Sequence, residues 1–260
     1  MDKVLEILPK FSSTSLDQMD KVKLMNRTDT KFIFNISQLP VILGTALEKY
    51  HILEINGERL LNYRTQYFDT EDFKMYVVHQ NRKLNRFKIR QREYMISDIS
   101  FLEVKFKSNK GRTIKKRIKS KGLVTELPPK FKKFIEEKTP FSGDELTTSV
   151  LNSFSRITLV HKTAQERITI DLNLGYKYKN ESVTLSYLTI AEVKREGYAK
   201  SDFIDILKEN RIYKQGMSKY SIGVLLFNKH LKYNTFKKKL LTLKKLANDD
   251  RYDSFFSRSR

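Results

Sequence analysis

Basic side chains alternate with apolar ones in three consecutive segments near the middle of the chain. Residues two apart in a β-strand project from the same face of a sheet. The pattern therefore predicts three strands, over 85–95, 101–107 and 112–119, each with one apolar and one cationic face. The cationic faces would carry Arg86, Lys88, Arg90 and Arg92, then Lys105 and Lys107, and then Lys115, Arg117 and Lys119.

Two later segments, 167–172 and 188–194, predict strands whose polar faces mix both signs. Arg167 and Asp171 would share one face, and Glu192 and Lys194 another. Like charges opposite each other on neighbouring strands cost between a few tenths and about 1 kcal/mol per pair. Gathering so many cations therefore favours a bound anion, although a solvated sheet face is the common explanation for any single strand.

These residue types suit phosphate chemistry. Arginine binds two phosphate oxygens at once, and lysine supplies a compact charge. Phosphoryl transfer usually needs a divalent cation held by carboxylates, for which Glu103 and Glu192 are candidates. Each glutamate could equally be an ion-pair partner of the lysine two residues further along its own strand, Lys105 or Lys194.

Composition narrows the class of partner. The chain has 260 residues and a formal net charge of +21, which attracts polyanions such as nucleic acid, nucleotides, polyphosphate or an anionic membrane surface. It has no cysteine, which excludes disulfides, thiolate metal sites and cysteine nucleophiles. The four histidines show no metal-ligand spacing. No apolar run reaches the roughly 18 residues of a membrane helix, and no signal peptide is visible.

The remaining pattern predicts the elements that position these faces. Further strands are expected over 28–35, 60–68 and 156–162, and the turn 108–111 should close a hairpin. Helices are expected over 37–48, 71–79, 130–138, 201–210 and 218–228, with Ser37 as an N-cap. The sum is an α+β fold with an antiparallel sheet. If the sheet closes, the charged faces could line a water-filled, anion-binding interior.

Eight short strings in this order resemble the VTC domain, the catalytic module of the vacuolar transporter chaperone complex. The VTC domain family is part of the CYTH, or triphosphate tunnel metalloenzyme, superfamily, so the resemblance extends to that superfamily. The resemblance runs from about Arg27 to Asn228. The strings are Arg27-x-Asp29-x-Lys31, Tyr63-Arg64-Thr65-x-Tyr67-Phe68-Asp69-Thr70, Lys88-x-Arg90-x-Arg92-x-Tyr94, Phe101-Leu102-Glu103-Val104-Lys105, Lys115-x-Arg117, Arg167-x-Thr169-Ile170-Asp171, Ala191-Glu192-Val193-Lys194 and Ser218-Lys219-Tyr220.

The resemblance implies a closed antiparallel β-barrel tunnel with flanking helices. It also implies an enzyme that transfers the γ-phosphoryl group of ATP to a growing polyphosphate chain with Mn²⁺ or Mg²⁺. By position, the phosphate-gripping residues would be Arg90, Arg92, Lys105, Arg167 and Lys219. Further substrate-binding residues would be Lys31, Lys88, Lys115, Arg117, Lys194 and Ser218. Glu192 would hold the metal, with Glu103 as a second candidate.

One departure bears on the reaction. Hydrolytic enzymes of the resembled superfamily usually open with a Glu-x-Glu-x-Lys string. In this sequence Phe101 stands where the first glutamate would be. This favours the polymerase branch, while a triphosphate or polyphosphate hydrolase and a non-catalytic polyphosphate-binding module remain alternatives. A nucleic-acid binder is not expected, because no basic motif is interleaved with aromatic residues.

The expected organisation has three parts. Residues 1–26 form a lead-in, residues 27–228 the tunnel domain, and residues 229–260 a basic tail. The tail is expected either to pack loosely on the domain as a solvated helix or to dock on an anionic membrane or partner protein. We expect a cytoplasmic protein that a membrane-protein partner would hold at the inner face of a membrane. The sequence sets no oligomeric state.

Overall fold

The computed structural model describes residues 1–21, 27–248 and 256. The chain forms two compact units that interleave along the sequence. The first unit comprises Met1–Asn62, Phe154–Leu174 and Leu185–Met217. The second comprises Tyr63–Ser153, Gly175–Thr184 and Ser218–Arg260. Several long strands contribute residues to both units.

The first unit is built on a sheet with the strand order β2-β11-β9-β8. Its strands are β2 (Arg27–Asn35), β11 (Leu188–Glu196), β9 (Glu166–Tyr178) and β8 (Leu146–His161). β3 (Tyr50–Leu53) pairs with β8, and β1 (Ser13–Thr14) with β3. The helical segments are α1 (Asp2–Ile7), η1 (Leu8–Lys10), α2 (Leu16–Lys21), η2 (Ile36–Gln38), α3 (Leu39–Ala46) and α6 (Asp202–Glu209).

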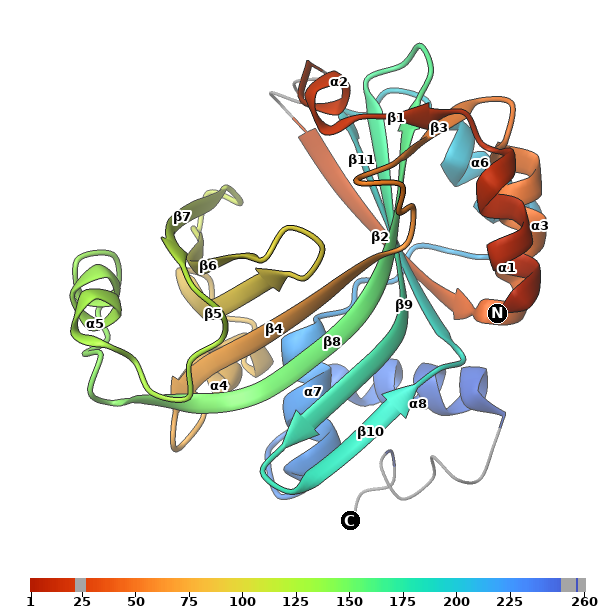
Figure 1. Cartoon of the computed structure of the whole chain (residues 1–260). Helices are drawn as coiled ribbons and strands as arrows, with labels where there is room; N and C mark the ends of the chain where they lie inside the picture. The colour runs from red at the N-terminus through yellow and green to blue at the C-terminus, as the bar shows by residue number, and fades with distance from the viewer. Residues whose placement is uncertain (22–26, 249–255, 257–260) are drawn as a thin grey trace. The chain divides into compact units, whose positions relative to one another are not determined.

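The core of the first unit lies against one face of this sheet. Alternate residues of β2, β9 and β11 point to that face, including Phe32, Ile170 and Val193, and each is at most 2% exposed. Side chains from α3 and α6, such as Leu43 and Phe203, complete the cluster at 0% exposure. Figure 1 shows α1, α3 and α6 gathered beside this part of the sheet. Covering this face leaves the alternate residues on the opposite, charged face.

The second unit continues the sheet through β8-β4-β5-β6-β7. Its strands are β4 (Leu61–Thr70), β5 (Arg86–Tyr94), β6 (Ile99–Lys107) and β7 (Thr113–Ser120), and β10 (Glu181–Leu185) pairs with β9. The helical segments are α4 (Lys74–Gln80), α5 (Pro129–Glu136), α7 (Lys219–Phe227), η3 (Asn234–Phe236) and α8 (Lys237–Ala247). Residues Ile89, Leu102 and Val104 pack with Phe131 and Ile135 of α5 in a second apolar core.

The predicted alternation of faces on β5, β6 and β7 is confirmed by the register. Lys88 lies opposite Lys105, which lies opposite Lys115, whereas Ile89 lies opposite Val104. The predicted hairpin is also present: the Ser108 N–H donates to the Arg112 carbonyl at 2.9 Å, and Gly111 has a φ of 76°. Glycine tolerates this left-handed conformation without strain.

The fold confirms an α+β protein with an antiparallel sheet and flanking helices. The closed barrel is not confirmed: among the described residues the strand order ends at β2 in one direction and at β7 in the other. Each unit thus carries its own charged face, and the meeting of the two faces in one tunnel stays a prediction.

Three local predictions need correction. Asn35, not Ser37, caps the first helical turn, because the Asn35 side chain accepts the Ser37 N–H at 2.9 Å. β8 begins at Leu146, ten residues before the predicted strand. The sequence pattern did not predict this start, because the early residues of β8 alternate only weakly between small polar and apolar types. The strand β3 was not predicted, since four residues show too short an alternation.

The C-terminal basic segment packs firmly on the second unit as far as residue 248. Phe236, Leu240 and Leu243 are at most 2% exposed, and the Thr235 hydroxyl donates to the Gln80 carbonyl at 2.7 Å. The expected loose packing is therefore wrong for this stretch. The end of the predicted tail, 249–255 and 257–260, lies outside the described residues. Within the described part of the chain, no helix is both long and apolar enough to cross a membrane.

Candidate functional site

Three lysines form a row across the charged face of the second unit. The register places Lys88 of β5, Lys105 of β6 and Lys115 of β7 directly opposite one another. Directly opposed like charges destabilise a sheet, because the side chains lie only about 5 Å apart at Cβ. We call Lys88, Lys105 and Lys115 the lysine row.

A single buried carboxylate anchors the next row. Glu103 is 0% exposed and pairs with Arg90, whose Nη2 lies 2.7 Å from Oε2, and with Lys115, whose Nζ lies 2.6 Å from Oε1. Burial alone would raise the pKa of Glu103, but Arg90 and Lys115 hold it well below its usual range. Glu103 is therefore ionised, and both its oxygens are engaged by cations. The predicted pairing with Lys105 is replaced by these two partners.

Lys105 lies where the cations crowd most closely. The Arg90 guanidinium, burial and the Arg92 guanidinium lower the pKa of Lys105 to about 6, and Glu103 only partly opposes them. An anion bound beside Lys105 would favour its charged form and raise its pKa toward the ordinary value.

Arginines continue the cationic face beyond this row. Arg92 is 8% exposed, and its Nε donates to the Thr65 hydroxyl at 3.2 Å. Arg117 stacks on the Phe101 ring, with its Cζ 4.3 Å from the ring centroid. Phe101 thus gives the Arg117 guanidinium an aromatic surface on which to stack. Glu103, which lies opposite Arg117, is the acid that the register places beside these two arginines.

The N-terminus of α7 adjoins the lysine row. Ser218 caps the helix by accepting the Ser221 N–H at 3.3 Å, and the Lys88 ammonium donates to the Ser218 hydroxyl at 3.1 Å. Lys219 is the first residue of the helix. Two lysines at a helix N-terminus oppose the helix dipole, whereas an anion there is stabilised by it.

A buried aspartate positions this helix. Asp69 is 0% exposed; it accepts N–H groups of Met75 and Tyr76 at 2.9 and 3.0 Å at the start of α4, and the Tyr220 hydroxyl of α7. From the sequence alone, Asp69 was named only as part of one family string and was given no role. Its signal was a lone acid at the end of an apolar strand, which is typical of a structural cap rather than a ligand-binding residue.

The charged face of the first unit is balanced instead. Glu192 of β11 pairs with the Lys31 ammonium of β2 and with Lys194, whose Nζ lies 3.0 Å from Oε2. Burial would raise the pKa of Glu192, but Lys194 and Lys31 hold it far below its usual range. The pKa of Lys194 is lowered to about 8, mainly by burial. Glu192 raises this pKa, while the charges of Arg156 and Arg167 lower it further. Both roles considered for Glu192 stay open, because an ion-paired carboxylate can also bind a metal.

A bidentate ion pair lies beside these residues. Arg156 of β8 donates to Asp171 of β9 through Nε at 2.6 Å and Nη2 at 2.9 Å. Arg167 lies opposite Lys194 in the register of the same sheet. Sequence reasoning missed Arg156, although it opens a predicted strand and faces the same way as the other charged residues.

The thirteen predicted site residues therefore fall into two groups. The structure brings together Lys88, Arg90, Arg92, Glu103, Lys105, Lys115, Arg117, Ser218 and Lys219 in the second unit, and Lys31, Arg167, Glu192 and Lys194 in the first. The two candidate metal ligands thus belong to different units. No group of three His, Cys, Asp or Glu suited to a metal occurs among the described residues.

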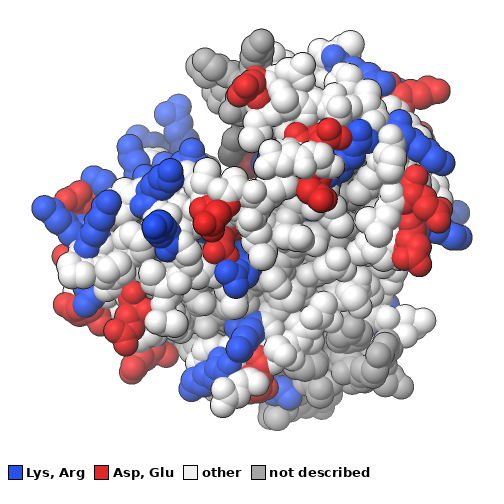
Figure 2. Space-filling model, in the orientation of Figure 1, with Lys and Arg blue, Asp and Glu red and all other residues white. Residues whose placement is uncertain are grey.

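The charge distribution is visible on the surface. Figure 2 shows Lys and Arg side chains gathered over β7 and its neighbouring turns. Most residues of β7 are exposed, including Lys115, Lys116 and Arg117. The edge of the second unit's sheet is therefore open to a polyanion from solution.

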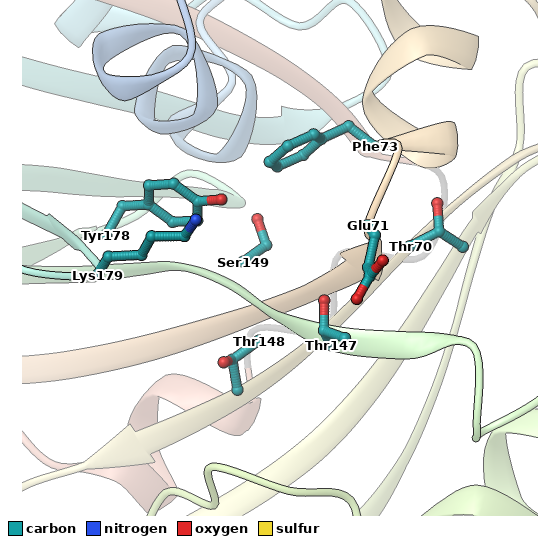
Figure 3. Close-up of a pocket in the computed structure, with 8 residues that line it drawn as sticks. All are labelled: Thr70, Glu71, Phe73, Thr147, Thr148, Ser149, Tyr178 and Lys179. Carbon is teal, nitrogen blue, oxygen red and sulfur yellow. The ribbon is translucent and has the colours of Figure 1, made fainter.

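A separate pocket of about 510 Å³ lies elsewhere in the second unit. Its lining consists of Thr70, Glu71, Phe73, Thr147, Thr148, Ser149, Tyr178 and Lys179. Figure 3 shows hydroxyl groups and the Phe73 ring around the space, with the Lys179 side chain beside the Tyr178 ring. One acid and one amine leave the lining without net charge, so it lacks the chemistry of a phosphate site.

Comparison with family models decides the family. The model of the VTC domain matches residues 26–228. The chain belongs to the VTC domain family. The match spans strands β2 to β11 and helix α7, so it includes every predicted site residue. Family membership supports a triphosphate-related function.

Solved structures with similar folds have low sequence identity. A candidate adenylate cyclase from Vibrio parahaemolyticus shares 10% identity at a TM-score of 0.45, covering 75% of this chain and 96% of its own. A candidate adenylyl cyclase from Hippeastrum, described as having a dominant triphosphatase activity, shares 15% identity at a TM-score of 0.46, covering 76% and 95%. No curated protein matches the chain.

Proposed function

We propose that this VTC domain is a phosphotransferase that moves the γ-phosphoryl group of ATP onto the end of a polyphosphate chain. The observation that carries the proposal is the lysine row. The three lysines lie in direct register beside Arg90 and Arg92. The crowding of cations lowers the pKa of Lys105 to about 6, and an oxyanion bound beside the row would offset that repulsion. A linear polyphosphate supplies charge at regular intervals along its length, which suits a row of cations better than a single anion does.

The residues of the second unit would bind and orient the phosphates. Arginines hold phosphate oxygens bidentately, and the lysine row neutralises charge on the transferred group. In the transfer, the bond between the γ-phosphorus and the ADP oxygen breaks, and a bond forms to a terminal oxygen of the acceptor. No covalent nucleophile is needed, because positioning and charge neutralisation dominate phosphoryl transfer.

The described residues offer a divalent cation single carboxylates and no complete set of protein ligands. A metal cage made of protein alone does not fit, since the described residues hold no group of three suitable ligands. Mg²⁺ and similar ions, however, are often held by one or two carboxylates plus substrate phosphates and water. Glu192 would hold such an ion, which would neutralise charge on the transferred phosphate. Lys31 and Lys194 keep the Glu192 carboxylate ionised and ready for that role.

The proposal includes the closed tunnel that the family resemblance implies, with Glu192 and the lysine row serving one substrate. Each face supports this separately, because its charged residues alternate with apolar residues that pack in a core on the other side of the sheet. The proposed polymerase needs both faces, whereas a simple polyphosphate-binding module needs only the second unit. Activity of a Glu192 variant therefore separates these two functions.

The decisive assay incubates the purified chain with ATP and Mn²⁺ or Mg²⁺ and resolves the products on a gel. We expect polyphosphate chains and ADP. Orthophosphate without chains would show a hydrolase, and no turnover with retained binding would show a binding module. Lys115→Ala should reduce synthesis at least tenfold. Lys116→Ala is the matched control, because it lies next door on the same exposed strand but opposite Val104 on the other face.

A further inference from the structure

A chain of polar groups runs from the interior of the second unit to the lysine row. It begins at His79 of α4, whose Nδ1 lies 2.8 Å from the Ser221 hydroxyl of α7. The Ser221 hydroxyl lies 3.1 Å from that of Ser218, which accepts from the Lys88 ammonium at 3.1 Å. Ser221 is 0% exposed, so no solvent competes for its bonds.

The Ser218 hydroxyl is surrounded by donors. The Ser221 N–H lies 3.3 Å away, and the Lys88 ammonium and Ser221 hydroxyl each lie 3.1 Å away. A hydroxyl has two lone pairs and one hydrogen. When all three neighbours donate to Ser218, two of them share one lone pair and the third takes the other, so the Ser218 hydrogen points away from them and outward. Ser218 then becomes a donor toward an anion at the N-terminus of α7.

His79 decides whether Ser221 can donate. A neutral imidazole has one N–H donor and one bare acceptor nitrogen, and its tautomer fixes which is which. If Nδ1 carries the hydrogen, it donates to Ser221, and Ser221 donates onward to Ser218. If Nδ1 is bare, Ser221 donates to His79 instead, and the Ser218 hydrogen can turn inward to Ser221.

The surroundings of His79 keep it neutral. Burial lowers the pKa of His79 far below its usual range, and the Lys88 and Arg86 charges lower it further. The Phe236 ring stands edge-on to the imidazole, with ring centroids 5.3 Å apart. His79 therefore adds no charge to the cationic face, and it can act there only through the direction of its hydrogen bond.

We propose that His79, as the Nδ1–H tautomer, is a positioning residue that turns the Ser218 hydroxyl outward as a donor to a bound phosphate oxygen. The inference rests on the proposed phosphate site, which it deepens. His79 touches no substrate itself. It acts through Ser221 and Ser218, and Phe236 of the C-terminal segment holds its ring in place.

The test measures tripolyphosphate binding to the full chain by titration calorimetry. His79→Leu removes the donor and should weaken binding about tenfold, in the range of a lost hydrogen bond to a charged group. His79→Asn places an amide N–H near the Nδ1 position and should recover most of that affinity. Failure of the wild-type chain to bind would overturn the phosphate site itself. Wild-type binding with unchanged affinity in folded His79→Leu would overturn the role of His79 alone.

A double substitution separates positioning from packing. If His79 acts through Ser218, then His79→Leu should cost almost nothing further in a Ser218→Ala background. Additive losses would contradict the relay. Tyr76→Phe is the matched control on the same helix: it removes a 2.7 Å hydrogen bond to the Lys232 carbonyl without touching the chain of hydroxyls. It should lower the melting temperature and leave affinity unchanged; an equal loss of affinity would show that general loosening explains the result.

Discussion

The charged faces of the two units differ in how many acids lie among their cations. In the first unit, cations and acids alternate as neighbours: Lys31 and Lys194 share Glu192, and Arg156 is paired with Asp171. In the second unit, Glu103 is the one acid that the described register places on the cationic face of β5, β6 and β7, since Glu93 of β5 lies on the opposite face. Those cations are Arg86, Lys88, Arg90, Arg92, Lys105, Lys107, Lys115, Arg117 and Lys119.

The two faces therefore differ in how far acids of the same unit pair with their cations. Ion pairs engage Lys31, Lys194 and Arg156 in the first unit, and repulsion there is smaller: burial, Arg156 and Arg167 lower the pKa of Lys194 only to about 8. The second unit retains repulsion, which the lowered pKa of Lys105, about 6, makes visible. An anion that binds only the folded protein relieves that repulsion and adds its binding free energy to stability. We therefore expect ligand effects in the second unit and structural effects in the first.

The largest expected effect comes from breaking the buried pair of the first unit. Asp171→Asn leaves Arg156 beside a neutral amide and should lower the free energy of unfolding by about 3–5 kcal/mol. Arg156→Met combined with Asp171→Leu should lose much less than the two single changes together, because no charge is then left unpaired. Urea unfolding measures Asp171→Asn, the double variant and its two single changes. A loss below about 1 kcal/mol for Asp171→Asn would show that this pair is solvated.

The next effect distinguishes the two roles of Glu192. Glu192→Gln keeps the volume of the side chain and removes its charge. If the carboxylate holds a divalent ion, turnover should fall roughly a hundredfold or more, because an electrostatic contact to the reacting group is lost. Metal-free binding of polyphosphate should persist or tighten. Turnover titrated against metal concentration decides the matter: an unchanged metal requirement rules out the ligand role and leaves an ion pair with Lys31 and Lys194.

A smaller, opposite pair of effects is expected at Lys105. Lys105→Met should raise the stability of the ligand-free protein by up to about 1 kcal/mol, because it removes one member of the lysine row. It should also weaken tripolyphosphate binding about tenfold, the loss expected for a charged contact. Thermal melting with and without tripolyphosphate measures both. A variant that is less stable and binds normally would contradict the comparison between the two faces.

The pH dependence follows from the same residue. The pKa of Lys105 is lowered from 10.5 to about 6 in the folded protein, so the unfolded chain binds more protons between these values. Stability of the ligand-free protein should therefore rise as pH increases through this window, and Lys105→Met should lack that part of the slope. Anion binding restores the charge and takes up a proton, so tripolyphosphate affinity should fall as pH rises above 6. Unfolding at several pH values checks the sign.

The smallest effect is that of salt. Added KCl screens exposed repulsion more than it weakens buried pairs. Low concentrations should therefore raise the melting temperature of the ligand-free wild type slightly, by the equivalent of a few tenths of a kcal/mol. The rise should be smaller in Lys115→Met, since Lys115 is the exposed end of the lysine row. Equal rises in both proteins would place the repulsion elsewhere.

Alternation in the sequence was enough to predict the strands and faces that matter most. A period of two over β5, β6 and β7 separates Ile89 and Val104 from Lys88 and Lys105 without any tertiary information. It also predicted that Glu192 and Lys194 share a face. The resemblance to the VTC domain was confirmed by the family match over residues 26–228.

The partners of each residue could not be predicted, because pairing depends on register between distant strands. Nothing local shows that Lys31 reaches Glu192 across β2 and β11, or that Glu103 prefers Arg90 and Lys115 to Lys105. The packing of Phe236 and Leu240 was missed for a related reason: the many lysines of that segment suggest a solvated helix, while its apolar stripe is short. The His79 chain likewise joins α4 to a helix far along the sequence.

The central claim is that the lysine row binds linear phosphate. A crystal structure of the chain grown with tripolyphosphate tests it most directly, because phosphorus positions can be read against individual side chains. We expect phosphate groups within hydrogen-bonding distance of Lys88, Lys105 and Lys115, with one oxygen accepting from Ser218. Phosphate found only away from these residues, with the lysine row bare in a structure that contains bound tripolyphosphate, would contradict it.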